Sequence, residues 1–186
     1  MIEYNQRMEI KRAPLLVPII MFLVFGACSR QAGSPSNTNL QANNNGAARP
    51  HNSVDFVKAT AGQAEIRAGG TGEATVHLTI ENGYHVNANP PTFPYLKPTT
   101  VTIPNADGFT VAFIKYPNAV TKKFSFADQP LSVYEGQAEI KVSLKTAPTV
   151  SAGPHQLPAT LGIQACDDQV CYAPGTIALS VPVVVK

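Results

Sequence analysis

Two cysteines near the end of the chain are the residues whose types and spacing best suit chemistry. Cys166 and Cys171 flank the stretch 167–170, which is mostly polar and favours a tight turn. A thiol pair this close in sequence can be a redox-active disulfide, a structural disulfide or part of a metal site. As a structural staple, a closed loop of six residues would add only about 2 kcal/mol in the chain-entropy model. The spacing therefore favours redox chemistry and leaves the structural and metal alternatives open.

The histidines give little support to a metal site, which needs three or four ligands. The sequence has no His-x-His motif and no second close pair of cysteines. Its four histidines are scattered along the chain: His51, His77, His85 and His155. We therefore predict no bound metal and no other cofactor. Neither a nucleophile elbow nor a zinc helix motif is present, which argues against a hydrolase.

The overall composition is that of a globular protein. The 186 residues are 44% hydrophobic and 14% charged, with a formal net charge of +2. The hydrophobic share argues against wholesale disorder, and the small net charge argues against a nucleic-acid partner. The length suits one domain with or without tails.

The first 27 residues are typical of an export signal. A basic start, 1–12, precedes the apolar run 13–27. Fifteen residues fall short of the roughly 20 that cross a bilayer as a helix, so the segment predicts a signal peptide rather than a membrane span. An exported protein enters an oxidising compartment, where the two later cysteines can pair.

The third cysteine stands at the end of this signal. Phe25, Gly26, Ala27 and Cys28 resemble the lipobox of bacterial lipoproteins. The resemblance implies cleavage before Cys28 and lipid attached to it, and several acyl chains would anchor the protein stably. By the same resemblance, Ser29 after the cysteine favours the outer membrane over the inner one.

A tether and one folded domain are expected after the signal. Residues 28–52 are rich in Asn, Ala and Gly and almost free of large apolar side chains, so they cannot bury enough surface to fold. They predict a disordered tether with a reach of about 25–30 Å. The folded domain is then 53–186, and we expect it to carry the function.

This domain shows the alternation of apolar and polar residues that is typical of β-strands. No segment has a convincing helical period with caps. The clearest strands are 74–80, 109–113, 138–144 and 177–185, and weaker ones are 64–68, 84–88, 99–103, 131–134 and 159–165. Seven to nine short strands separated by turn residues predict an all-β, immunoglobulin-like antiparallel β-sandwich. Pro182 inside the last strand predicts an edge or a bulge there.

Three stretches of the domain carry a family resemblance. They are 83–90 with 96–99 (GYHVNANP and LKPT), 116–136 (with YP, KKFSF and LSVYEG) and 165–174 (ACDDQVCYAP). In this order they resemble the N-terminal periplasmic domain of the DsbD thiol:disulfide interchange family. The resemblance implies an immunoglobulin-like domain whose cysteine pair passes electrons between a membrane-embedded reductase and periplasmic partner proteins.

The resemblance also implies roles for individual residues. Cys166 and Cys171 are the exchanging pair, of which one attacks a partner disulfide and the other resolves the mixed disulfide. Phe124 or Phe126 is the aromatic residue of a cap loop that shields the pair. Residues expected to lie beside the pair, to tune it or to shape the hairpin, are His85, Asn87 and Tyr172.

Two functions remain open at this stage. We expect a lipid-anchored periplasmic module of protein-disulfide oxidoreduction, whose status as an enzyme the sequence leaves undecided. No transmembrane electron-transfer domain and no thioredoxin-like Cys-x-x-Cys domain is found in this sequence, so the electrons would come from a separate membrane reductase in trans. The alternative is a non-enzymatic, immunoglobulin-like binding or assembly module with a structural disulfide.

Overall fold

The computed structural model describes residues 51–186. The predicted signal peptide, the predicted lipid on Cys28 and the predicted tether up to residue 50 lie outside the described residues. The described part begins with a short 3-10 helix and continues in strands. The elements are η1 (Ser53–Phe56), β1 (Val57–Ala61), β2 (Ala64–Ile66), β3 (Thr71–Ile80), β4 (His85–Asn87), β5 (Thr100–Thr102), β6 (Phe109–Lys115), β7 (Val120–Lys122), β8 (Leu131–Tyr134), β9 (Gln137–Thr146), β10 (Gly153–Ile163), β11 (Ala165–Cys166) and β12 (Gly175–Val185).

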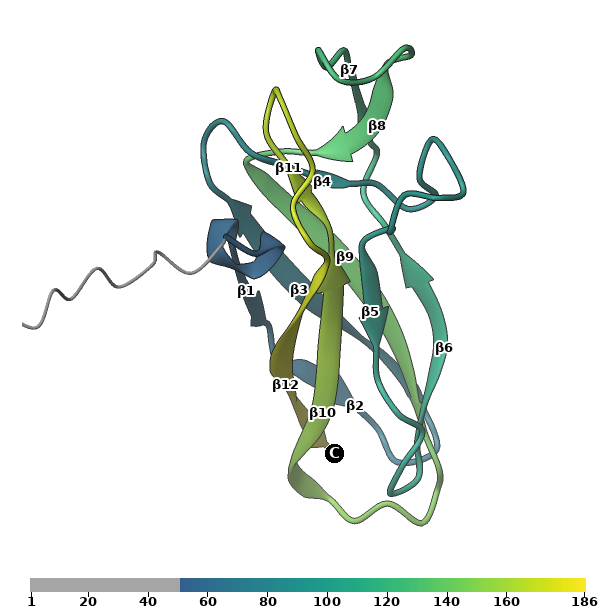
Figure 1. The fold of residues 1–186 in the computed structure, drawn as a ribbon. Helices are drawn as coiled ribbons and strands as arrows, with labels where there is room; N and C mark the ends of the chain where they lie inside the picture. The colour runs from purple at the N-terminus through teal and green to yellow at the C-terminus, as the bar shows by residue number, and fades with distance from the viewer. Residues whose placement is uncertain (1–50) are drawn as a thin grey trace, which may run out of the picture. The chain divides into compact units, whose positions relative to one another are not determined.

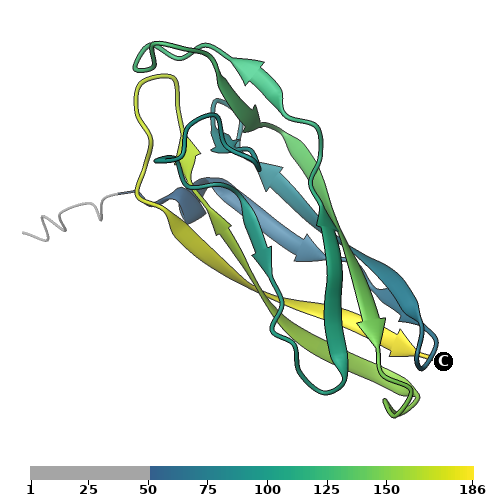
Figure 2. The same cartoon turned by 90° about the vertical axis from the view of Figure 1, so that its right-hand side faces the viewer.

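Two four-stranded sheets form the body of the domain (Figure 1). One sheet has the order β1-β3-β9-β6 and the other the order β2-β12-β10-β5. The view in Figure 2 shows the long strands of both sheets running along the length of the domain. Each sheet has one apolar face, and packing the two faces together buries both. The predicted all-β, immunoglobulin-like sandwich is confirmed.

The alternation in the sequence places the core between the two sheets. Ala74, Val76, Leu78 and Ile80 of β3 are at most 3% exposed, and the residues between them point away from the core. Val76 lies opposite Ile140 of β9, so the buried faces of both strands form one apolar surface. Each fully buried Val, Leu or Ile side chain contributes about 1.5–3 kcal/mol.

Some elements have no counterpart in the sequence pattern. β7 exposes two of its three residues, so it has no alternation to detect. The helix η1 is only four residues long, and its N-cap is Asn52, a residue that the sequence analysis assigns to the tether. The side chain of Asn52 accepts a hydrogen bond from Val54 N, and its backbone N–H donates to Asp55.

The last strand, β12, lies between β10 and β2. Its pairing with β2 is parallel, whereas its pairing with β10 is antiparallel. Pro182 pairs with Gln156 of β10, and the pairing with β2 begins only at Val183. Proline has no N–H to donate, and here it stands where the side toward β2 is unpaired. Pro182 therefore occupies a local edge position, one of the two environments that the sequence predicts.

A third, small sheet of order β11-β4-β8-β7 lies at one end of the sandwich, at the top of Figure 1. Neighbouring residues of a strand face opposite sides of a sheet. Ala165, Val86 and Tyr134 line up across three of these strands and are buried in the main core. The adjacent positions, including Cys166 and His85, therefore face the other side of the small sheet.

Two loops flank that second face. The cap loop, residues 123–130, joins β7 to β8, and the aromatic loop, residues 88–99, joins β4 to β5. Together with β8 they form a second buried cluster, which consists of Leu96, Phe124, Leu131 and Val133 with Phe93 and Ala127 packed against it. The small sheet thus has the main core on one side and an aromatic cluster on the other.

Candidate functional site at the cysteine hairpin

The cysteine pair closes a β-hairpin. Cys166 and Cys171 face each other in an antiparallel bridge and form a disulfide. Backbone hydrogen bonds flank the bridge on both sides, one at the turn and one toward the strands. The cysteines therefore occupy a non-hydrogen-bonded pair, where antiparallel strands approach most closely, and their Cα atoms are 3.9 Å apart. The short spacing thus places the two sulfur atoms within bonding reach.

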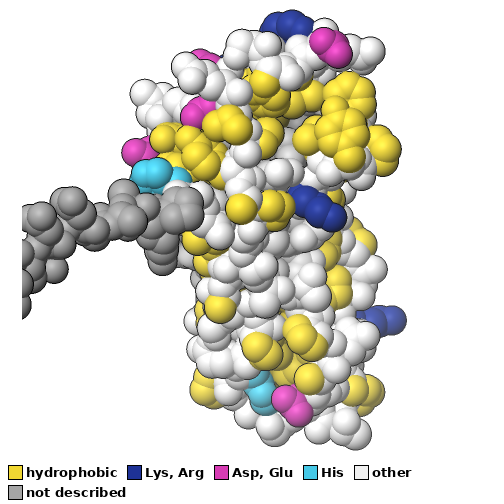
Figure 3. Space-filling model, in the orientation of Figure 1, with side chains coloured by type: hydrophobic (Ala, Val, Ile, Leu, Met, Phe, Trp, Pro, Cys, Tyr) yellow, Lys and Arg dark blue, Asp and Glu magenta, His cyan; other side chains and the backbone are white. Residues whose placement is uncertain are grey.

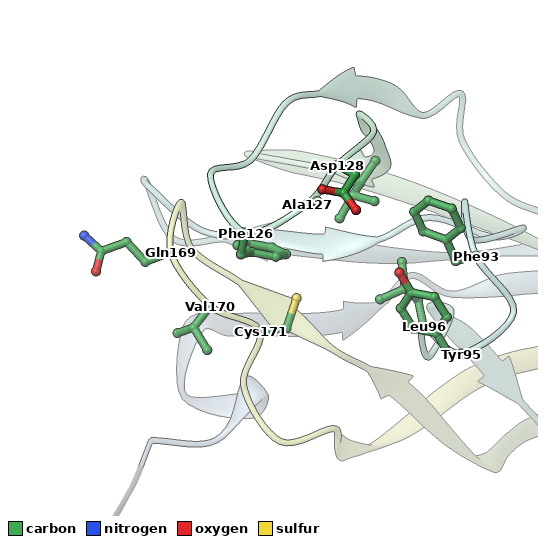
Figure 4. A pocket seen from close by; sticks show the side chains of 10 residues that line it. Phe93, Tyr95, Leu96, Phe126, Ala127, Asp128, Gln169, Val170 and Cys171 are labelled. Atoms are coloured by element: carbon green, nitrogen blue, oxygen red, sulfur yellow. The ribbon is translucent and has the colours of Figure 1, made fainter.

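The two cysteines differ in exposure. Cys166 is only 1% exposed, whereas Cys171 is half-buried and lines a pocket of about 350 Å³. Figure 4 shows Cys171 at this pocket, with Phe126 close to it. A thiolate that approaches from solvent therefore reaches the sulfur of Cys171 before that of Cys166.

The turn of the hairpin is organised by Asp167. Its Oδ1 accepts hydrogen bonds from the backbone of Gln169 (2.7 Å) and Val170 (2.8 Å), and its Oδ2 accepts one from the Tyr172 hydroxyl (2.7 Å). The bond from Tyr172 is the main cause of a lowered pKa of Asp167, and the same bond raises the pKa of Tyr172 to about 12. The Tyr172 ring also lies 4.7 Å from the Phe56 ring, so Tyr172 ties the turn to the sandwich.

His85 lies next to the pair, as the resemblance implies. It is directly opposite Cys166 in the β4–β11 register and is 2% exposed. Its Nε2 lies 2.5 Å from Nζ of Lys122 and 3.2 Å from a carboxylate oxygen of Glu135. Its ring meets Phe124 edge-on, with centroids 5.2 Å apart. Its Nδ1 has no hydrogen-bond partner among the described residues.

Asn87 supports a different part of the site. Its side-chain Nδ2 donates to the Lys97 carbonyl and to Gln164 Oε1, both at 3.1 Å. Its own carbonyl accepts a hydrogen bond from the Thr99 hydroxyl at 2.7 Å. These contacts hold the end of the aromatic loop against Gln164, which lies between β10 and β11 just before the hairpin. Asn87 is thereby placed to support the pocket wall.

The cap loop covers the small sheet with two phenylalanines. Phe124 is 1% exposed and belongs to the aromatic cluster, whereas Phe126 is 41% exposed and lines the pocket together with Cys171. Their ring centroids are 5.3 Å apart. The Ser125 hydroxyl donates to the carbonyl of Asp168 at 2.6 Å, so the cap loop is bonded to the tip of the hairpin. Phe126 is the outer residue of the cap and Phe124 the inner one.

The pocket has an apolar rim that the sequence analysis missed. Phe93 and Tyr95 of the aromatic loop stack with centroids 5.3 Å apart, and Tyr95 is 73% exposed. Val170, at the hairpin, is 50% exposed and lines the same pocket. Figure 3 shows apolar side chains gathered over this end of the domain. The sequence signal for this rim was the pair Phe93 and Tyr95, two aromatic residues in the proline-rich segment 90–98, where no strand could bury them.

Lys122 is another residue near the disulfide that the sequence analysis does not identify as a site residue. Besides its contact with His85, its Nζ lies 4.0 Å from Glu135 and 3.7 Å from Asp168, and it lies 5.9 Å from the Phe124 ring centroid. Lys122 therefore joins β7, the end of β8 and the hairpin. Lys122 is one of the two adjacent lysines of KKFSF (122–126), and nothing in the sequence distinguishes it from Lys123.

Within residues 51–186, no three His, Cys, Asp or Glu side chains are grouped so that they could hold a metal ion. The same range contains no helix that is both long and apolar enough to cross a membrane. The groups that do converge at the small sheet are a disulfide, a histidine, a lysine and several aromatic rings.

The fold and the site together define an immunoglobulin-like domain with a disulfide-bearing hairpin under a cap loop. A family model described as thiol:disulfide interchange protein DsbD, N-terminal, matches residues 53–181. The chain belongs to this family. The matched range contains the hairpin, the cap loop and the aromatic loop.

Solved structures with similar folds include two bacterial domains. The N-terminal periplasmic domain of ScsB from Proteus mirabilis is 15% identical with a TM-score of 0.49, and the match covers 68% of this chain and 46% of that one. The DsbD N-terminal domain of Neisseria meningitidis, in its reduced form, is 17% identical with a TM-score of 0.44, and the match covers 68% and 83%. The chain thus spans less than half of the ScsB domain. No curated protein matches this chain.

Proposed function

We propose that this protein is a periplasmic thiol:disulfide interchange module that relays electrons through Cys166 and Cys171. The observation that carries the proposal is the difference in exposure between the two cysteines. Cys171 opens onto the pocket, whereas Cys166 is buried behind it. An exchanging pair needs one sulfur that meets the partner and a second that resolves the intermediate, and the hairpin provides both.

The exchange follows from this arrangement. A partner thiolate attacks Sγ of Cys171, a new disulfide joins the partner to Cys171, and the Cys166–Cys171 bond breaks with its electron pair on Cys166. A second thiolate of the partner then attacks the partner's own sulfur in the mixed disulfide. This closes a disulfide within the partner and expels Cys171 as a thiolate, so that this domain becomes a dithiol. In the reverse direction, the Cys171 thiolate attacks a partner disulfide, and Cys166 resolves the mixed disulfide and releases the reduced partner.

The rim of the pocket supports a protein as the partner. Tyr95, Phe126 and Val170 expose large apolar surfaces around Cys171. Aromatic residues at a partly desolvated site are typical anchors of protein–protein contacts. A thiol protein with an apolar surface around its cysteine would cover these side chains, whereas a small thiol such as glutathione would leave them exposed.

The setting of the exchange is part of the proposal. The family is periplasmic, and we place this chain there, anchored by lipid on Cys28 in the outer membrane. A separate membrane-embedded reductase would supply the electrons, and periplasmic thiol:disulfide proteins would receive them. An intact-mass measurement of the mature protein tests the lipid on Cys28.

Trapping with single-cysteine variants tests the exchange. In Cys166→Ala the outward thiol remains without its resolving partner, so we expect stable mixed disulfides with periplasmic thiol proteins. In the matched variant Cys171→Ala only the buried thiol remains, and we expect at least about tenfold less adduct because the thiol is shielded from solvent. Equal trapping by the two variants would contradict the assignment of Cys171 as the attacking residue.

The same variants separate this function from that of a binding module with a structural disulfide. For such a module, the double variant Cys166→Ser, Cys171→Ser would still engage its partners once it is folded. We expect the folded double variant to form no covalent partner complex and to pass no electrons. Unchanged partner binding together with a disulfide that resists exchange would establish the alternative.

A further inference from the structure

Cys166 of the disulfide and His85 beside it are both buried. The inference drawn from this pair rests on the proposed exchange function. Cys166 becomes a thiolate when the disulfide opens, and it is 1% exposed. A buried anion without a hydrogen-bond donor is strongly disfavoured. His85, directly opposite on β4, has a buried Nδ1 that finds no hydrogen-bond partner within residues 51–186 in the disulfide state. Residues opposed in this way have Cβ atoms about 5 Å apart on the same face of the sheet.

The contact with Lys122 bears on which ring nitrogen of His85 carries the proton. A lysine ammonium has only donors to offer, and its Nζ lies 2.5 Å from Nε2 of His85. Of the two groups beside Nε2, the ammonium at 2.5 Å is nearer than the Glu135 carboxylate at 3.2 Å, so we assign Nε2 as the acceptor of a lysine proton. The neutral imidazole then carries its proton on Nδ1. Glu135, 3.2 Å from the same Nε2 and 4.0 Å from Lys122, helps to hold the ammonium there.

We propose that Lys122 is a positioning residue for disulfide exchange, which holds His85 in the tautomer whose Nδ1–H stabilises the Cys166 thiolate. The step balances without a further reactant. The attacking thiolate, from a protein or small-molecule thiol, bonds to Sγ of Cys171, and the electron pair of the broken S–S bond stays on Cys166. Once released, Sγ of Cys166 is free to rotate about its Cα–Cβ bond, and the Nδ1–H of His85 donates to it.

Charges of both signs surround His85 and the hairpin. The charged side chains around His85 are Lys122, Glu135 and Asp168, with Glu81 on the wall of the neighbouring pocket. Asp168 and Glu135 are 73% and 49% exposed, so water screens their repulsion of the thiolate. Lys122, at 35% exposure, is the cation nearest the buried ring. Asp167, which neighbours Cys166 in the sequence, directs its carboxylate at the backbone of the turn and at the Tyr172 hydroxyl. Lys122 is thus the charge that directly favours a thiolate beside His85.

Titration of the lone Cys166 thiol tests the proposal. In the full-length Cys171→Ala chain, thiolate absorbance at 240 nm reports the ionisation of Cys166 against pH. We expect Lys122→Met to raise the pKa of this thiol by about one pH unit, since it removes both a nearby cation and the donor to Nε2. His85→Phe should raise it similarly, and the two changes together should add little, because Lys122 acts through His85. Lys122→Gln, which keeps a donor for Nε2, should produce a smaller rise.

Two comparisons make the result decisive. Lys141→Met removes a half-exposed lysine of β9 that pairs with Glu73 of β3, away from the hairpin, and should leave the titration unchanged. An unchanged pKa in Lys122→Met, with a native near-UV circular dichroism spectrum, would overturn the proposal. A rise in Lys122→Gln as large as in Lys122→Met would overturn the tautomer argument. These titrations need no partner, so the proposal can fail while the exchange function stands, and the reverse.

Discussion

At the scale of single residues, the two cysteines of the hairpin differ in their exposure to solvent. Cys171 lines a pocket, whereas Cys166 is buried and lies opposite His85 of the neighbouring strand β4. In the proposed exchange, the accessible sulfur of Cys171 meets the partner and the buried sulfur of Cys166 leaves. Spacing in the sequence predicts the pair, but exposure depends on the cap loop, which approaches from far along the chain.

The contact between Asp167 and Tyr172 makes the stability of the hairpin depend on pH. Because the pKa of Asp167 is lowered in the folded state, its stabilising effect is present above the unfolded value of about 3.9 and is lost as the pH falls through the lowered pKa. The pKa of Tyr172 is raised to about 12. Its contribution is therefore complete below about pH 10 and is lost as the pH rises toward 12.

Removal of the Tyr172 hydroxyl tests this contact. We expect Tyr172→Phe to lower the free energy of unfolding at pH 7 and to have a smaller effect at pH 3, because pH 3 lies below the unfolded pKa of Asp167 and part of the stabilisation is already lost there. Urea unfolding at the two pH values gives the comparison. In Asp167→Asn, absorbance at 295 nm should show Tyr172 ionising closer to pH 10, its ordinary value. An equal loss of stability at both pH values would contradict the assignment.

At the scale of elements, the cap loop and the aromatic loop build the site over a sheet that the main core holds in place. The sequence predicts the strands that alternate strongly, such as β3 and β9, because each buries one face. It does not predict β7, which has no buried face. The aromatic loop is equally hard to predict, because no local pattern fixes it: Asn87 Nδ2 donates to its Lys97 carbonyl, and Gln164 Oε1 accepts a hydrogen bond from Lys97 N.

The two phenylalanines of the cap loop should respond differently to truncation. Phe124→Ala leaves a cavity in a closed cluster and should lower the free energy of unfolding by about 3–5 kcal/mol. Phe126→Ala removes a side chain that is 41% exposed, so it should cost little stability but speed the reduction of the disulfide by dithiothreitol. Urea unfolding and stopped-flow reduction measure the two effects. The same response from both variants would show that the cap has no inner and outer layers.

At the scale of the whole described domain, the sandwich carries the small sheet and its two loops at one end. Its core comprises long paired strands, and the small sheet extends beyond that core with its outer face under the two loops. Fold class follows from the periodic pattern in the sequence because burial on one face of a strand is a local signal. The site requires His85, Lys122 and Phe126 to lie beside the hairpin 166–171. These residues are far apart in the sequence, and the pairing of β4, β7, β8 and β11 brings them together.

The redox equilibrium of the disulfide tests the central claim most directly. The folded protein is equilibrated with glutathione or dithiothreitol buffers of graded potential, and intact mass after alkylation gives the fraction of Cys166–Cys171 that is reduced. An exchanging pair is expected to titrate at a potential above about −300 mV, within the range of redox-active protein disulfides. A pair that stays oxidised well below about −300 mV would be a structural bond and would contradict the proposed function.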